Sequence, residues 1–307
     1  MQFVKPPHPF PAAEHFASMR GANAIVFGAP HGTPYRGIDN GVHAASADAI
    51  RQALAEDGRW TDHWDFDLDG PLLAGRDFRL GDLGNLATTP DDGPGNRAKI
   101  EATTRAILAA GAVPLMIGGD DSVPIPFIAG FSAHGPMTIV QIDAHIDWRE
   151  ERRGERFGYS STMRRASEMA HVQRIVQVGI RGLGSAREQE VRDARAWGAQ
   201  IVTARQIHAR GIAAALDLIP PGGNCLITLD CDAIDGAAMP AVMAPTPGGL
   251  SYVQIIDLLA GIAGKARIAG FDLIEFVPGR DRGGYAAYVA GRILINVVGA
   301  LARASSR

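Results

Sequence analysis

The stretch that decides the fold is residues 137–147, which read Met-Thr-Ile-Val-Gln-Ile-Asp-Ala-His-Ile-Asp. An apolar run of this length predicts a strand buried on both faces, as in a parallel sheet. It ends in Asp143, His145 and Asp147, which are two positions apart. Side chains two apart share one face of an extended strand, so the three polar groups are predicted to point together.

Three further apolar runs end in acidic residues. They are residues 113–117 followed by Gly-Gly-Asp120-Asp121-Ser122, residues 225–229 followed by Asp230-Cys-Asp232-Ala-Ile-Asp235, and residues 267–271 followed by Asp272-Leu-Ile-Glu275. The carboxyl ends of parallel strands form the ligand-binding edge of an open sheet. We therefore expect the four clusters to converge at one edge.

Carboxylates gathered without a counter-ion would repel one another, and at least one would have to stay protonated. A multivalent cation removes that conflict, so we interpret the clusters as one metal site. The predicted ligands are Asp121, Asp143, His145, Asp147, Asp230 and Asp232. Oxygen donors with one imidazole favour Mn²⁺, followed by Mg²⁺, Fe²⁺ or Ni²⁺. Two ions bridged by carboxylates and a water would balance the charge and activate that water to hydrolyse a planar electrophilic carbon.

Single residues of these clusters also have local explanations. Residues 120–122 could cap the following helix, because Asp and Ser are good N-cap residues. Asp235 precedes Gly236 and fits a turn. Asp272 could be a carboxylate at the edge of the core that bonds to backbone. The combination of clusters, rather than any one of them, carries the metal-site prediction.

The rest of the chain alternates strands with helices, which predicts an α/β fold whose parallel sheet is covered on both faces. Expected strands are 24–27, one near 77–80, 113–117, 137–142, 174–179, 200–203, 225–230 and 267–274. Expected helices are 44–57, 96–110, one after 122, 161–170, 186–197, 211–218, 251–263 and 284–304. Residues 1–22 are Pro-rich and predict an extended arm, and residues 23–307 predict a single domain.

Composition limits the class of protein. The 307 residues carry a formal net charge of -3, which gives no electrostatic footprint for nucleic acid. Arg149–Arg156 alternates with glutamates and predicts a solvated, self-paired loop. Cys225 and Cys231 predict buried, reduced thiols. We find no signal peptide and no apolar stretch of about 18 residues, so we expect a cytoplasmic protein without a membrane partner.

The four motifs, in this order and spacing, resemble the ureohydrolase family of arginases, agmatinases and guanidino-acid hydrolases. The resemblance covers about residues 23–304, and residues 159–166 and 245–250 are most similar to the agmatinase branch. It implies a three-layer α/β/α fold with a mainly parallel eight-stranded sheet. It further implies two Mn²⁺ ions per chain (with Ni²⁺ or Co²⁺ as alternatives), a bridging hydroxide, urea as a product, and a homotrimer or homohexamer.

Carried over by position, the resemblance implies the same six metal ligands, with Asp120 as a supporting partner. The implied catalytic residues are Asp147, Glu275 and Tyr159, and the expected substrate contacts are Glu275, Arg149 and His31. Glu275 would hold the substrate guanidinium, since a carboxylate accepts a paired set of N–H donors.

Two positions depart from the family pattern. Asp121 stands where the family has a His ligand, and its extra negative charge should tighten cation binding while making the bridging water less acidic. Tyr159 stands where agmatinases have a proton-shuttling His. Tyr159 could act as the acid, or His31 could take over, and His31 could equally be a loop residue at the pocket mouth.

The segments that would select the substrate argue against L-arginine. Trp148-Arg149 replaces the Asn that arginases have, and residues 179–184 lack the arginase acidic residue. Arg149 would favour a substrate with an acidic tail, or it would pair with Glu150 or Glu151 on the surface. We expect metal-dependent hydrolysis of agmatine or a guanidino acid to urea and an amine. The alternatives are an impaired paralogue that serves as a binding or assembly subunit, and a hydrolase of another C–N bond, formimino or substituted guanidine.

Overall fold

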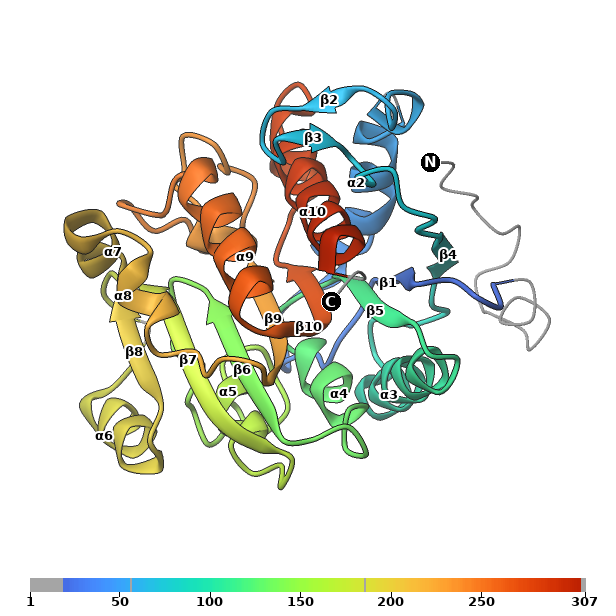
Figure 1. The fold of residues 1–307 in the computed structure, drawn as a ribbon. Helices are drawn as coiled ribbons and strands as arrows, with labels where there is room; N and C mark the ends of the chain where they lie inside the picture. The colour runs from blue at the N-terminus through green and yellow to red at the C-terminus, as the bar shows by residue number, and fades with distance from the viewer. Residues whose placement is uncertain (1–18, 56, 185, 305–307) are drawn as a thin grey trace.

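The computed structural model describes residues 19–55, 57–184 and 186–304, and its centre is one eight-stranded sheet (Figure 1). All strand pairs in this sheet are parallel, and the order is β4-β1-β5-β10-β9-β6-β7-β8. The strands are β1 (Ala24–Ala29), β4 (Leu80–Asn85), β5 (Val113–Gly118), β6 (Met137–Ile142), β7 (Val172–Ile180), β8 (Gln200–Thr203), β9 (Asn224–Asp230) and β10 (Arg267–Ile274). A separate antiparallel pair is β2 (Trp64–Asp65) with β3 (Gly70–Pro71).

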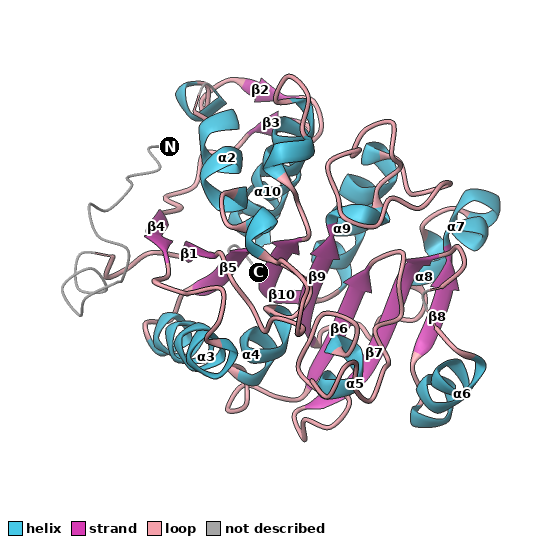
Figure 2. Ribbon diagram, turned by 180° about the vertical axis from the view of Figure 1, so that it is seen from behind, coloured by secondary structure: helices cyan, strands magenta, loops and turns pink. Residues whose placement is uncertain are grey.

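Helices cover both faces of the sheet, which confirms the three-layer α/β/α prediction (Figure 2). One face carries α2 (Ser46–Ala53), α7 (Ala204–Arg210), α8 (Ala213–Leu216), α9 (Tyr252–Lys265) and α10 (Tyr285–Ala304). The other carries α3 (Gly93–Ala109), α4 (Pro124–Ala129), α5 (Thr162–Ala166) and α6 (Glu188–Trp197). Short 3₁₀ turns are η1 (Gly41–His43), η2 (Asp57–Arg59), η3 (Cys231–Ala233) and η4 (Pro278–Arg280).

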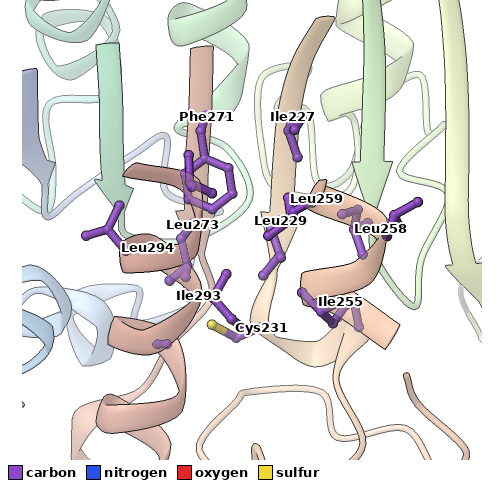
Figure 3. Packing of buried hydrophobic residues seen from close by; sticks show 14 of the residues in the cluster. Ile227, Leu229, Cys231, Ile255, Leu258, Leu259, Phe271, Leu273, Ile293 and Leu294 are labelled. Carbon is purple, nitrogen blue, oxygen red and sulfur yellow. The ribbon is translucent and has the colours of Figure 1, made fainter. Parts of the chain in front are cut away.

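The central strands are mostly apolar because their alternate residues enter two different cores. Ile227 and Leu229 of β9 face the core under α9 and α10, whereas Leu226 faces the opposite core. Figure 3 shows the first core, where side chains of β9 and β10 pack against those of α9 and α10. Burying each such Leu or Ile contributes about 1.5–3 kcal/mol. Cys231 lies in this core and, like Cys225, is a buried free thiol.

Helix α10 corrects one sequence expectation. It is 20 residues long with a mean hydropathy of 1.5, so a segment of this chain does reach the length and composition of a membrane span. However, 83% of its 18-residue window is buried inside the fold, and it packs on α9, α2 and β10. In the part of the chain that the structure describes, α10 is therefore a buried helix in the helical layer on one face of the sheet.

Several element boundaries also differ from the predictions. The strand expected near 77–80 is β4, which begins only at Leu80. Its Asp82 is buried and bonded to Arg51 at 2.8 Å, and this carboxylate interrupts the apolar pattern by which a strand is recognised in the sequence. Helices expected over 44–57 and 161–170 are shorter. Helix α7 was missed, although Thr203 and Gln206 form a capping box that marks its start. Residues 1–18 of the expected arm lie outside the described residues.

Candidate metal centre and its pocket

The predicted ligands follow strands that are neighbours in the sheet. Asp121 follows β5, Glu275 follows β10, Asp230 ends β9 and Asp143 follows β6, and these four strands are adjacent in the order β5-β10-β9-β6. Because all four are parallel, their carboxyl ends meet at the same edge. The structure therefore brings the four acidic clusters together.

Two overlapping groups of side chains have ligand atoms that lie within 4.8 Å of one another. One group is Asp143, His145 and Asp232, and the other is Asp121, Asp143 and Asp147. Asp143 belongs to both. Asp230 lines the same cavity and accepts a bond from the Asp232 amide at 2.7 Å. Two groups that share one carboxylate match the geometry expected for a pair of bridged ions.

The carboxylates are buried close together and lack enough hydrogen-bond donors, which is the environment that a bound cation would stabilise. Both oxygens of Asp121 are buried and have no hydrogen-bond partner among the described residues. Burial, reinforced by neighbouring carboxylates, raises the pKa of Asp121, Asp147 and Asp230 well above the usual range. Buried charges of one sign are tolerated in proteins when they coordinate a metal. The oxygen-rich donor set with a single imidazole suits a divalent ion such as Mn²⁺.

These raised pKa values predict how the metal-depleted protein responds to pH. Each carboxyl has a folded pKa above its unfolded value near 4, so the folded state binds more protons and the free energy of unfolding falls as pH rises. His145 acts in the same direction: burial lowers its pKa, but bonds to Asp143 and Asp232 raise it to about 12, so its stabilisation also declines with rising pH.

We expect the chelator-treated protein to lose stability steadily from pH 5 to pH 9, a range in which ordinary carboxylates are already ionised. Urea denaturation midpoints at several pH values, with and without Mn²⁺, would measure this loss of stability. Stability that rises with pH in the chelated protein would contradict the clustering of these groups.

Two carboxylates are presented by unusual backbone. Asp147 and Glu275 have φ values of 43° and 64°, in the left-handed region that side-chain-bearing residues seldom adopt. Such conformations persist where the surrounding structure holds them, and they concentrate at functional sites. Glu275 is held by its own amide bonding to the Gly119 carbonyl and by its Oε1 accepting from the Asp121 amide, both at 2.9 Å.

His43 is a pocket residue that the sequence interpretation missed. It is 2% exposed, donates from Nδ1 to the Phe276 carbonyl at 3.1 Å, and places Nε2 3.4 Å from Oε2 of Glu275. Burial lowers the pKa of His43. Nothing in the local sequence distinguishes it, because its partners are more than 230 positions away.

Asp120 supports the loop after β5. Its Oδ1 accepts from the amide and hydroxyl of Ser122, its Oδ2 accepts from Asn40, and the Ser122 hydroxyl in turn accepts from the Thr33 amide at 2.6 Å. These bonds tie the loop that carries Asp121 to the segment after β1.

The pocket mouth carries two arginines. Arg152 donates to the Tyr159 hydroxyl at 2.8 Å, and its guanidinium lies 5.3 Å from the Tyr35 ring centre. Arg149 donates to the Gly184 carbonyl at 3.2 Å and lies 3.9 Å from Glu190.

Arg149 therefore does not make the surface pair with Glu150 that we expected as one alternative. Glu150 instead bonds Arg156, Arg164 and Arg165. Arg152 was missed because it lies in the Arg-Glu stretch that was interpreted as a self-paired loop.

These groups surround one cavity of about 290 Å³. Its described lining includes Asp121, His145, Asp147, Asp230, Asp232, Glu275, Tyr159, Arg149, Arg152 and His43. His31 is not among these described lining residues; its Nδ1 bonds the Thr88 hydroxyl at 3.0 Å. We call the buried carboxylates of this cavity its acidic floor and the partly exposed Arg149 and Arg152 its basic rim.

Comparisons with known proteins agree with this arrangement. The sequence model of the arginase family matches residues 22–299. Guanidinopropionase of Pseudomonas aeruginosa is 29% identical over 235 residues, 75% of this chain and 73% of that protein. Proclavaminate amidinohydrolase of Streptomyces clavuligerus is 29% identical over 301 residues, 94% of this chain and 91% of that protein.

Solved structures have the same fold. The structure of the Streptomyces clavuligerus amidinohydrolase aligns with a TM-score of 0.75 at 28% identity, over 97% of this chain and 94% of the other. An agmatine ureohydrolase of Thermoplasma volcanium aligns with a TM-score of 0.76 at 25% identity, over 92% and 90%.

Fold, site and relatives together define a three-layer α/β/α hydrolase that acts on C–N bonds. More narrowly, the chain belongs to the arginase family.

Proposed function

We propose that this protein hydrolyses a linear guanidino compound to urea and a primary amine, with two divalent cations, Mn²⁺ first among them. The observation that carries the proposal is the cavity lined by Asp147, Glu275 and Asp121, whose buried oxygens have no hydrogen-bond partner among the described residues, with Asp143 beside them in the same ligand group. In the balanced reaction, a guanidinium and one water give urea and an alkylammonium ion. When bound, the cations would supply a water of lowered pKa as the nucleophile.

The chain's own side chains divide the remaining tasks. Asp121, Asp143, His145, Asp147, Asp230 and Asp232 would hold the cations. Glu275 would accept N–H bonds from the guanidinium and so orient its carbon above the acidic floor. Asp147 is the group we assign to carry a proton from water toward the leaving amine.

Tyr159 is suited to be a proton donor at the pocket mouth. Burial raises its pKa above 10, despite the opposing effect of Arg152, so its hydroxyl stays protonated at neutral pH. Because Tyr159 Oη already accepts from Arg152, its own proton remains available for another acceptor. We propose this hydroxyl, rather than His31, as the last donor to the departing amine, and the proton that Asp147 takes from water would then return to Tyr159, so that both groups end as they began.

The basic rim favours a guanidino acid over agmatine. Arg149 and Arg152 both line the cavity that contains Glu275. A carboxylate tail would make charge-assisted bonds with this rim, whereas the ammonium tail of agmatine would be repelled. The relative guanidinopropionase is named for a substrate of this acidic type.

Replacing Arg152 by alanine tests whether the protein prefers a substrate with a carboxylate tail to one with an ammonium tail. We expect kcat/KM for an ω-guanidino acid to fall by roughly 10- to 100-fold, mainly through KM, because a bond to a charged group contributes about 1.5–3 kcal/mol. In the same variant kcat/KM for agmatine should fall less, because only the bond that supports Tyr159 is lost there. Arg156→Ala, which removes an exposed arginine paired with Glu150, is the matched control. A larger loss with agmatine than with the guanidino acid would refute the assignment of the rim.

A urea-release assay across a panel of guanidino compounds, with Mn²⁺, Ni²⁺ or Co²⁺ supplied, tests the activity itself. The panel includes agmatine and guanidino acids of increasing length, and a formimino compound is assayed beside it by release of formamide, because its hydrolysis gives no urea. Asp121 and Tyr159 favour a second candidate, an impaired paralogue that binds partners, since they replace a family ligand and the family shuttle together. Absence of turnover with every pair would support that candidate. A trimeric or hexameric assembly stays a prediction of the resemblance, and a cytoplasmic location stays a prediction of the sequence.

A further inference from the structure

A row of buried polar side chains crosses the central strands below the candidate metal centre. Gln177 of β7, Gln141 of β6, Thr228 of β9 and Asp272 of β10 are paired in register, each with the next. All four are at most 1% exposed, although their neighbours along each strand are apolar. Buried polar groups are costly unless they are bonded, so such a row needs a reason.

Gln141 connects this row to two predicted metal ligands. Its Nε2 donates to Oδ2 of Asp143 at 2.8 Å and to Oδ2 of Asp147 at 2.7 Å. A side-chain amide has two N–H donors, so one reaches each carboxylate. The amide therefore holds one oxygen of each ligand and fixes the distance between the two carboxylates.

Gln177 determines which way the Gln141 amide points. Its Nε2 donates to Oε1 of Gln141 at 2.6 Å and to the carbonyl of Ile146 at 2.8 Å. Because a donor occupies its oxygen end, Gln141 must turn its nitrogen toward Asp143 and Asp147. The second bond of Gln177 holds the backbone of the residue just before Asp147.

Together these bonds hold the loop 143–147 in a strained form. Asp147 has its φ of 43° at the end of this loop, a conformation that other contacts must maintain. The loop is also held by the Arg181 amide on the Ala144 carbonyl at 3.0 Å. An amide suits the task because it donates without adding a positive charge that would compete with a cation for the carboxylates.

We propose that Gln141 and Gln177 are positioning residues, an amide relay that presets Asp143 and Asp147 to bind divalent cations. The inference rests on the metal site of the proposed function and deepens it. The relay makes no contact with substrate in this arrangement; it acts through the carboxylates. Partners that orient metal ligands typically change metal affinity 10- to 100-fold when they are removed.

The test measures Mn²⁺ binding to the chelator-treated full chain by isothermal titration calorimetry, together with the melting temperature. We expect Gln141→Leu to weaken Mn²⁺ binding by roughly 10- to 100-fold and Gln177→Leu to weaken it by about 10-fold. The matched control is Thr228→Val, which alters the same row but bonds only Asp272. It should lower the melting temperature and keep Mn²⁺ affinity within about twofold, as for sites without shared partners.

The double variant separates a relay from two independent supports. Because Gln177 acts partly through Gln141, the double variant should lose less affinity than the sum of the single losses. Full additivity, or Mn²⁺ affinity in Gln141→Leu within twofold of the parent, would overturn the relay while leaving the proposed function intact. If Gln141→Leu does not fold, Gln177→Leu against Thr228→Val decides the question alone. A parent chain that binds none of Mn²⁺, Ni²⁺ and Co²⁺ would overturn both the proposed function and the relay.

Discussion

The Asp143→Ala variant is expected to release no measurable urea from any guanidino compound. Asp143 is the one residue common to both groups of candidate ligands, so its removal takes a donor from each ion at once. An ion held at one position cannot replace the pair, because the activated water is expected to lie between the two. Residual activity above a few per cent of the parent would contradict a shared, bridging role for this carboxylate.

The same variant should change stability in opposite directions with and without metal. In the chelated protein, deleting one of several buried carboxylates relieves repulsion, so the melting temperature should rise or hold. In Mn²⁺, the parent is stabilised by a ligand that binds only the folded state, and the variant loses most of that stabilisation. Differential scanning calorimetry with and without metal would measure the two shifts.

Asp235→Asn is the matched control for Asp143→Ala. Asp235 belongs to the neighbouring strand-end cluster, the one that follows residue 229, but the structure uses it in a turn, where Oδ1 accepts from the Ala237 amide at 3.0 Å. The change to asparagine keeps that bond. Asp235→Asn should retain both the activity and the rise in melting temperature on adding Mn²⁺. Loss of either would show that these properties depend on the total negative charge at this edge of the sheet and not on Asp143 in particular.

Glu275→Gln is expected to lower kcat/KM by roughly 100-fold or more, because removing one partner of a buried charge pair costs about 2–5 kcal/mol. The variant keeps the size of the side chain and an oxygen that accepts from the Asp121 amide. However, it aims an N–H group at a substrate that also offers only N–H groups. The variant should therefore bind the cationic guanidinium group more weakly, and the chemical step itself should be less affected.

Metal binding distinguishes the loss of activity in Glu275→Gln from the loss in Asp143→Ala. Glu275 lies outside both groups of candidate ligands among the described residues, so Mn²⁺ affinity of Glu275→Gln should remain close to that of the parent. Binding of the guanidinium ion, measured by calorimetry and therefore without turnover, should weaken in parallel with kcat/KM. A variant that loses Mn²⁺ while still binding guanidinium would show that Glu275 is a metal ligand instead.

The sequence predicted the architecture well where one physical rule dominates. Strands such as 137–142 are buried on both faces and are therefore mainly apolar runs, which end where the chain reaches the polar edge of the sheet. The carboxylates after residue 142 and after residue 229 were predicted together because like charges at strand ends need a counter-ion. The raised pKa values and the missing partners of Asp121 follow the same reasoning.

The sequence could not reveal residues whose role depends on distant contacts. His43 acts on Glu275 across the fold, and Arg152 in a charged loop has no local sign that it reaches the pocket. Gln141 sits inside an apolar run, where a single polar residue carries no information about its partner. Edge strand β4 was misplaced because its buried Asp82 is compensated by Arg51, from a helix about thirty residues earlier.

The order of the strands has a consequence for how the protein is made. β10 comes after every other strand of the described residues, yet it inserts between β5 and β9 and carries Glu275 to the pocket. A nascent chain that stops before residue 267 would present two unjoined sheet edges and no complete pocket. The ligand group of Asp121, Asp143 and Asp147 therefore cannot assemble before β10 joins β5 to β9, and the unfinished chain must be protected from edge-to-edge aggregation until residues 267–274 emerge.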